Sequence, residues 1–155
     1  MVTIKGIDSL TREELVEELR ILSAEYTALL KSARAILDSL KMINDSRGHA
    51  EGDKYLQACA ALFKETLRGY DLLARVGGDE FALVLNRTDI ETGEKIMKRI
   101  RNNIEKHNQD QTALPLSISM GIAVSESPAQ PLEETFRGAD GQMYKEKLAR
   151  RTLET

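Results

Sequence analysis

The sequence has few of the features that would indicate a disulfide-stabilised, membrane-spanning or strongly basic protein. Its 155 residues include one cysteine, so no internal disulfide can form. No apolar run approaches the roughly 20 residues that a membrane-spanning helix needs. The formal net charge of -3 excludes a global basic field that would attract nucleic acid or membranes. The N-terminus lacks a charged-then-apolar signal pattern. We therefore expect a cytoplasmic protein with no DNA or RNA partner and no membrane segment.

Helical periodicity dominates the first part of the chain. In residues 12 to 43, apolar residues recur at alternating steps of four and three, which is the pattern of a heptad seam. Thr11 and Glu14 have the spacing of a capping box at the start of this segment. Residues 50 to 69 predict a second amphipathic helix that ends at Gly69.

Helix and strand patterns alternate further along the chain. Thr88 and Glu91 have the spacing of another capping box, which predicts a helix to about Lys106. In residues 116 to 124, large apolar residues alternate with small ones, so we expect a strand with one small face against which a helix packs closely. Residues 131 to 151 predict a last helix, with acids in its first turn and cations in its last.

The stretch ARVGGDEFALVL, residues 74 to 85, predicts a β-hairpin. Two glycines separate two short apolar runs, and hairpin turns of the primed types need positive φ, which glycine adopts readily. We expect strands at about Leu72 to Val76 and Glu80 to Leu85, with Gly77 and Gly78 in the turn. Both faces of the second strand are apolar, which is typical of a central strand. Helices packed on a sheet that contains this antiparallel hairpin give an α+β fold.

The hairpin tip carries two acids, Asp79 and Glu80, beside its glycines. Glycines allow a polyanion to approach the backbone closely, and carboxylates beside phosphates are typical ligands of a magnesium ion. The same five residues are also compatible with an ordinary glycine turn that carries solvated acids.

Several segments together resemble the GGDEF domain, the diguanylate cyclase family. Residues 77 to 81, GGDEF, match its signature, and LKMINDSRGHAEGD, residues 40 to 53, resembles its lysine, asparagine and Gly-Asp segment. LSISMGIA, residues 116 to 123, resembles its late strand, and ADGQMYKEKLARR, residues 139 to 151, resembles its terminal helix. The matches run in the family's order from about Ala35 to Arg151.

The resemblance implies a fold related to nucleotidyl cyclases and polymerase palm domains. It implies condensation of two GTP molecules into cyclic di-GMP, with release of pyrophosphate, in bacterial signalling. A homodimer would bring one GTP on each subunit together. We expect residues 31 to 155 to form this single domain and residues 1 to 30 to form a helical lead-in.

The resemblance also assigns roles to individual residues. Asp79 and Glu80 would be catalytic. A Mg²⁺ or Mn²⁺ ion would be bound by Asp79 and by the backbone carbonyl of Leu37, with Glu80 as a further candidate ligand. GTP would be bound by Lys41, Asn44, Asp53, Gly77, Gly78, Lys147 and Arg151. Two simpler readings stay open, because cations suit any helix C-terminus and the asparagine and aspartate suit turns.

A second group, Arg68 and Asp71 in RGYD, lies just before the hairpin. In the family, Arg-x-x-Asp at this offset is the inhibitory product-binding site, and Arg99 matches an arginine that completes it. An arginine can stack on a purine and donate in pairs to its edge or to a phosphate. A surface ion pair at the same spacing is the alternative.

The chain departs from the family at its first metal ligand. Counting back from Lys41 and Asn44, the family's first metal aspartate corresponds to Ile36, which cannot ligate magnesium. Asp38 matches the second acidic position, two residues on. In a strand it would share a face with Ile36 but lie roughly 6–7 Å away.

Residues 12 to 43 also carry two conflicting signals. Their heptad period predicts helix, whereas the resemblance predicts a strand near Ala33 to Leu37. Lys31 and Arg34 stand where a central apolar strand would run. We favour the strand.

Three functions follow from these observations. The first is an active diguanylate cyclase. The second is a catalytically weak or silent module that binds cyclic di-GMP or GTP as a receptor, and Ile36 favours it. The third is a dimerisation module driven by the heptad seam. The intact GGDEF segment argues against the third, because a scaffold does not need it.

Overall fold

The computed structural model describes residues 11, 13–14, 31–86, 88–125 and 129–153. Most of the predicted helical lead-in, residues 1 to 30, lies outside this set. Its predicted capping box is confirmed, because Thr11 N–H donates to Glu14 Oε2 at 2.8 Å and Glu14 N–H donates to Thr11 Oγ1 at 3.2 Å.

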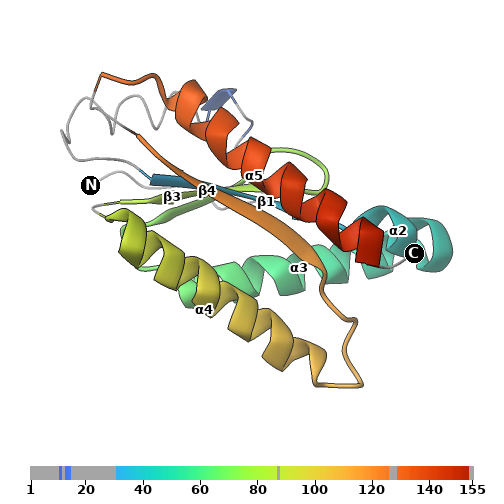
Figure 1. Cartoon of the computed structure of the whole chain (residues 1–155). Coiled ribbons are helices and arrows are strands. Elements are labelled where there is room, and N and C mark those ends of the chain that lie inside the picture. The colour runs from blue at the N-terminus through green and yellow to red at the C-terminus, as the bar shows by residue number, and fades with distance from the viewer. Residues whose placement is uncertain (1–10, 12, 15–30, 87, 126–128, 154–155) are drawn as a thin grey trace.

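The described residues form four strands and four helices (Figure 1). In chain order they are β1 (Lys31–Leu37), α2 (Leu40–Arg47), α3 (His49–Thr66), β2 (Leu72–Arg75), β3 (Glu80–Leu85), α4 (Ile90–Asn108), β4 (Ile118–Val124) and α5 (Leu132–Leu153). The strand order is β2-β3-β1-β4, and each neighbouring pair is antiparallel. Figure 1 shows α5 on one side of the sheet, with α3 and α4 on the other. The α+β prediction is confirmed.

Strand β1 settles the conflict in the N-terminal half. The favoured prediction of a strand near Ala33 to Leu37 is confirmed, because residues 31 to 37 pair with β3 on one side and with β4 on the other, and the helical alternative is wrong here. Ala33, Ala35 and Leu37 enter the main apolar core. The sheet ladder satisfies the backbone on both edges, and this overrides the local helical period.

The β2–β3 hairpin is confirmed, with β2 one residue shorter than predicted. Gly77 and Gly78 lie in the connection, but neither has a positive φ, so the argument from a primed turn is wrong. Gly48 is the described glycine with that geometry, with φ 88° at the junction of α2 and α3. The glycines at the hairpin tip therefore contribute small size rather than an unusual backbone conformation.

Two predicted helix ends are displaced. Helix α3 ends at Thr66, three residues before Gly69, because Leu67 takes an extended conformation. Helix α4 is capped by Asp89, whose side chain accepts from Thr92 N–H at 2.7 Å, so the capping box predicted from Thr88 is wrong.

The small face of β4 positions α5. A Cβ atom on Gly121 would lie 2.1 Å from the carbonyl oxygen of Ala139, so the helix backbone rests directly on the strand. The prediction of close helix packing here is confirmed. No helix among the described residues is long and apolar enough to cross a membrane.

Candidate functional site

The hairpin tip is held against the end of β1. Leu37 N–H donates to the carbonyl oxygen of Asp79 at 2.8 Å, and Val76 N–H donates to that of Glu80 at 2.9 Å. Asp79 itself is half-buried. The sequence therefore folds so that the GGDEF turn lies beside the last residue of β1.

Glu80 points to the α5 side of the sheet and has a protein partner. Its Oε2 lies 3.1 Å from Nη2 of Arg34, a residue of β1. Nε of Arg34 lies 2.9 Å from Oδ1 of Asp140 in α5, although this contact lacks hydrogen-bond geometry. The guanidinium also lies 5.7 Å from the ring centre of Phe136. Sequence reasoning noted Arg34 as an anomaly in an apolar strand but did not identify its partners.

A hollow of about 660 Å³ lies between the hairpin and α5. Its lining includes Arg34, Glu80, Asp140 and Tyr144. It therefore presents fixed charges of both signs beside the second acid of the GGDEF turn.

Ile36 lies on this same side of β1 and is buried, with 8% of its surface exposed. It is opposite Glu80 in the β1–β3 register and opposite Ser119 in the β1–β4 register. Directly paired residues of antiparallel strands share a face, so an acid at position 36 would lie beside Glu80. The structure thus places an alkyl group where the family resemblance expects a metal ligand.

Asp38, the other acid near this point, is engaged by β4. The hydroxyl of Ser119 donates to its Oδ2 at 2.7 Å, and that of Ser117 lies 3.4 Å away. Oδ1 is buried without a hydrogen-bond partner in the described part of the chain. Burial therefore raises the pKa of Asp38, and the two serines with Arg150 and Lys147 oppose that shift.

These residues fit a metal ion only in part. Among the described residues, no group of three or more histidine, cysteine, aspartate or glutamate side chains is arranged to hold a metal. Ile36 offers no oxygen, and Glu80 is paired with Arg34. Asp79 and the Leu37 carbonyl remain. The site does not fit a divalent ion held by the protein alone, and it leaves one carboxylate for an ion that arrives with a triphosphate.

The predicted guanine-binding residues meet at the corner between α2 and α3. Asn44 is half-buried and its side chain lies directly against Gly52, where a Cβ would be 1.7 Å from Asn44 Oδ1. Asp53 is the next residue and is exposed, as is Lys41 on α2. The glycine lets the two helices approach closely enough to bring the amide and the carboxylate together.

A second hollow, of about 350 Å³, links this corner to the hairpin. It is lined by Asp53 and Lys64 from α3 and by Arg75 and Phe81 from the two hairpin strands. Arg75 donates to the carbonyl oxygens of Gly77 and Gly78, at 3.2 and 2.8 Å, and fixes the turn. Sequence reasoning missed Arg75, although its position two residues before the glycine pair was a usable signal.

The cations of α5 lie over the end of β1. Lys147 and Arg150 are close enough to Asp38 to lower its pKa electrostatically. Arg150 also pairs with Glu146 at 3.1 Å, and Glu146 pairs with Arg101 at 2.6 Å. Arg151 is exposed near the end of the same helix. The cation-bearing end of α5 therefore lies near Asp38, which follows β1 and is hydrogen-bonded to Ser119 of β4.

Arg68 and Asp71 form an ion pair at the other end of the hairpin, and this pair is called the bracket below. Arg68 Nε and Nη2 donate to the carboxylate of Asp71 at 3.2 and 3.3 Å, and Asn86 N–H donates to the same carboxylate at 3.1 Å. The Asp71 side chain is fully buried, whereas that of Arg68 is 29% exposed. The carboxylate raises the pKa of the Arg68 guanidinium, which stays charged.

Three further groups surround this bracket. The Arg68 guanidinium lies 4.6 Å from the ring centre of Tyr70 and donates to the hydroxyl of Thr88. Arg99 donates to the carbonyl of Thr66, at the end of α3, so α4 brings the third predicted residue to the same region. The structure thus collects the three residues expected for the product site.

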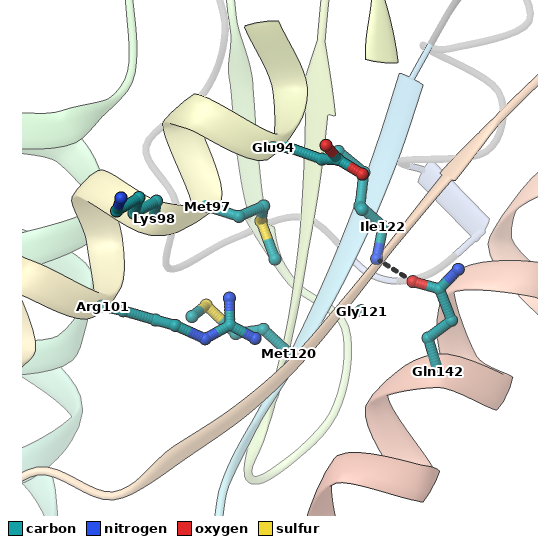
Figure 2. Close-up of a pocket in the computed structure, with 8 residues that line it drawn as sticks. All are labelled: Glu94, Met97, Lys98, Arg101, Met120, Gly121, Ile122 and Gln142. Carbon is teal, nitrogen blue, oxygen red and sulfur yellow. Dashed lines mark hydrogen bonds between the residues drawn. The ribbon is translucent and has the colours of Figure 1, made fainter. Parts of the chain in front are cut away.

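A third hollow, of about 330 Å³, lies along the outer edge of β4 and contains none of the predicted residues. Figure 2 shows Gln142 reaching from α5 to the strand, where its Oε1 accepts from Ile122 N–H at 3.2 Å. Met97 and Arg101 approach from α4.

Comparisons with known proteins agree with this geometry. A family model described as "Diguanylate cyclase, GGDEF domain" matches residues 12–152. "Probable diguanylate cyclase DgcT" of Escherichia coli is 36% identical over 115 residues, which is 72% of this chain and 25% of that protein. The chain thus spans about a quarter of that relative's length.

Solved structures show the same fold. Diguanylate cyclase SiaD of Pseudomonas aeruginosa, solved with its activator SiaC, has a TM-score of 0.79 and 27% identity, covering 90% of this chain and 55% of that one. A microbial GGDEF domain, solved in a study of its interaction with cyclic di-GMP, has a TM-score of 0.75 and 25% identity, covering 92% and 88%. The chain belongs to the GGDEF domain family.

Proposed function

We propose that this chain is a guanine-nucleotide domain of the diguanylate cyclase type, which acts as a cytoplasmic homodimer and turns over slowly. It binds GTP and condenses two molecules into cyclic di-GMP. The observation that carries the proposal is the GGDEF turn: the carbonyl oxygen of Asp79 accepts from Leu37 N–H at the end of β1. Arg75, which donates to the carbonyl oxygen of Gly78, lines a hollow together with Asp53.

Each group of the site has a binding role in this proposal. Asn44 and Asp53 accept and donate along the guanine edge, because an amide and a carboxylate complement its donors and acceptors. Gly77 and Gly78 let the phosphates approach the backbone. The charge of the phosphates is balanced by Lys41, Lys147 and Arg151.

The reaction requires two subunits. Each 3′-hydroxyl loses its proton to solvent and attacks the α-phosphorus of the other GTP, so two phosphodiester bonds form as two pyrophosphates leave. A divalent ion that arrives with the nucleotide would neutralise charge at the phosphates, and Asp79 would be the carboxylate that holds it in this chain. The dimer brings the two nucleotides into register, which supplies the proximity that the step needs.

A second candidate is a receptor that binds cyclic di-GMP without turnover. Two observations favour it: Ile36 replaces the expected acid, and Glu80 is paired with Arg34. The Arg68–Asp71 pair supports the receptor as a candidate ligand site, and a related GGDEF domain was solved in a study of its interaction with cyclic di-GMP.

One experiment separates the two candidates. The protein is incubated with GTP and Mg²⁺, cyclic di-GMP and pyrophosphate are measured, and cyclic di-GMP binding is measured by calorimetry. Slow turnover that Asp79→Ala abolishes supports the cyclase, with Glu91→Ala on the exposed start of α4 as the control. Binding without turnover selects the receptor. Absence of both turnover and binding contradicts both proposals.

A further inference from the structure

Arg34 places a buried guanidinium on the α5 side of β1, two residues before Ile36. Its side chain is 9% exposed, so the charge is largely removed from water. A buried charge persists only where partners compensate it, and arginine does not lose its proton in proteins. The position therefore carries a permanent cation.

The partners of this cation come from two other elements. Glu80 of β3 lies 3.1 Å from Nη2, and Asp140 of α5 lies 2.9 Å from Nε. Their side chains are 37% and 42% exposed, so both carboxylates face the hollow between the hairpin and α5. Phe136 covers the guanidinium from α5. Arg34 thus ties the GGDEF hairpin to α5.

A divalent ion at Glu80 would compete with this arrangement. It would have to displace Arg34 from the carboxylate or lie close to the guanidinium, and like charges at such distances repel strongly in a partly buried site. Ile36, directly opposite Glu80, adds no ligand in exchange. An acid introduced at residue 36 would lie on the same face of β1 as Arg34 and would gain it as a neighbour.

We propose that Arg34 is the fixed counter-cation of Glu80 and excludes a protein-held divalent ion from the α5 side of the hairpin. This proposal deepens the proposed function, because it names the residue that sets how the site depends on metal. It rests on the proposed function only for the identity of the nucleotide. Arg34 and Ile36 act together: Arg34 pairs with the carboxylate of Glu80, and Ile36 provides no second carboxylate beside it.

The test is a Mn²⁺ titration without nucleotide, in which electron paramagnetic resonance counts the free ion. Wild type and Ile36→Asp are expected to bind Mn²⁺ more weakly than millimolar. The double variant Arg34→Met/Ile36→Asp frees Glu80 and adds the second acid, so its dissociation constant should be at least tenfold lower. Because no nucleotide is present, failure of GTP binding would leave this result unaffected.

Matched variants isolate the charge. Arg34→Lys/Ile36→Asp keeps the cation and should show no gain. Arg101→Met/Ile36→Asp removes an arginine that is paired with Glu146 instead, and it should behave as Ile36→Asp alone. Far-ultraviolet circular dichroism confirms the fold, and Arg34→Gln replaces Arg34→Met if the methionine variant is unfolded.

Three results would overturn the proposal. The first is tight Mn²⁺ binding by wild type that Glu80→Gln abolishes. The second is a full gain in Ile36→Asp with Arg34 still present. The third is no gain in a folded double variant.

Discussion

The two faces of the sheet have different chemistry. The face covered by α3 and α4 is apolar, with Leu37, Phe81, Leu83 and Ile118 all nearly inaccessible to solvent. The face covered by α5 carries a guanidinium, a carboxylate and small side chains. Its residues include Arg34, Ile36, Glu80, Ser119 and Gly121.

The two faces differ in what they contribute. The larger cluster of buried hydrophobic residues includes the face that α3 and α4 cover, and burial of apolar surface stabilises the fold. Arg34 and Ile36, which stand where the family resemblance predicts an apolar strand residue and a metal aspartate, both lie on the α5 face. We therefore expect the apolar face to dominate stability and the α5 face to set the chemistry of the site.

The largest expected effect is on the apolar face. Leu83 is 1% exposed in β3, so Leu83→Ala should lower the free energy of unfolding by about 3–4 kcal/mol, through lost burial and a cavity. Urea denaturation measures the change. Leu148→Ala, at an exposed leucine of α5, is the control and should have little effect. A cost below about 1 kcal/mol for Leu83→Ala would mean that this face does not dominate stability.

On the α5 face, we expect that enlarging a side chain lowers the free energy of unfolding more than shortening one does. Gly121→Ala places a methyl group against the Ala139 carbonyl, which cannot rotate away, so we expect a loss of about 2–3 kcal/mol. Gly141→Ala is the matched control on α5, where a Cβ meets open space, and it should stabilise by about 0.5–1 kcal/mol. Thermal and urea unfolding compare the two. Equal effects would show that α5 does not rest on β4 as closely as the structure indicates.

The bracket at the far end of the hairpin lies away from Arg34 and Ile36. It should therefore bind cyclic di-GMP whether or not the protein turns over GTP. Arg68→Ala should weaken cyclic di-GMP binding roughly ten- to hundredfold, since a hydrogen bond to a charged group contributes about 1.5–3 kcal/mol. Calorimetry on folded protein measures the loss. Arg47→Ala, at an exposed arginine of α2, should leave affinity unchanged. Unchanged affinity in Arg68→Ala would reduce the bracket to a structural ion pair.

The sequence was sufficient to predict what depends on local pattern. The hairpin, the helix cap at Thr11 and the small face of β4 follow from spacing and residue size, and the structure agrees. Arg68 pairs with Asp71, and Arg99 donates to the carbonyl of Thr66 nearby in the chain, but the predicted role of these residues in product binding stays a prediction.

What the sequence could not supply are contacts between distant elements. The heptad period through residues 31 to 37 was misleading because strand pairing with β3 and β4 decides the conformation there. The ion pairs of Arg34 join residues that are 46 positions apart in one case, so no local pattern reveals them. The hydrogen bonds from Arg75 to the carbonyl oxygens of Gly77 and Gly78 were likewise not predicted.

The smallest expected effect is a pH dependence from the α5 face. Burial raises the pKa of Asp38, so the folded state holds this proton more tightly than the unfolded state does. The stability contributed by the protonated form is fully present below about pH 4 and is lost as pH rises through the raised pKa. The substitution Asp38→Asn removes the ionisable group, so the variant lacks this loss of stability with rising pH. The free energy of unfolding of wild type relative to the variant should therefore fall as pH rises above about 4, through the raised pKa.

A control of opposite sign comes from Asp110. Its pKa is lowered by hydrogen bonds from Thr112, so its stabilising contribution is present above about pH 4 and is lost as pH falls through the lowered pKa. In Asp110→Asn the relative stability of wild type should instead rise with pH. Urea denaturation at a series of pH values on the three proteins measures both slopes. A slope of the Asp110 sign at Asp38 would mean that the serines and α5 cations outweigh burial. Ionised Asp38 would then raise the free energy of unfolding rather than lower it.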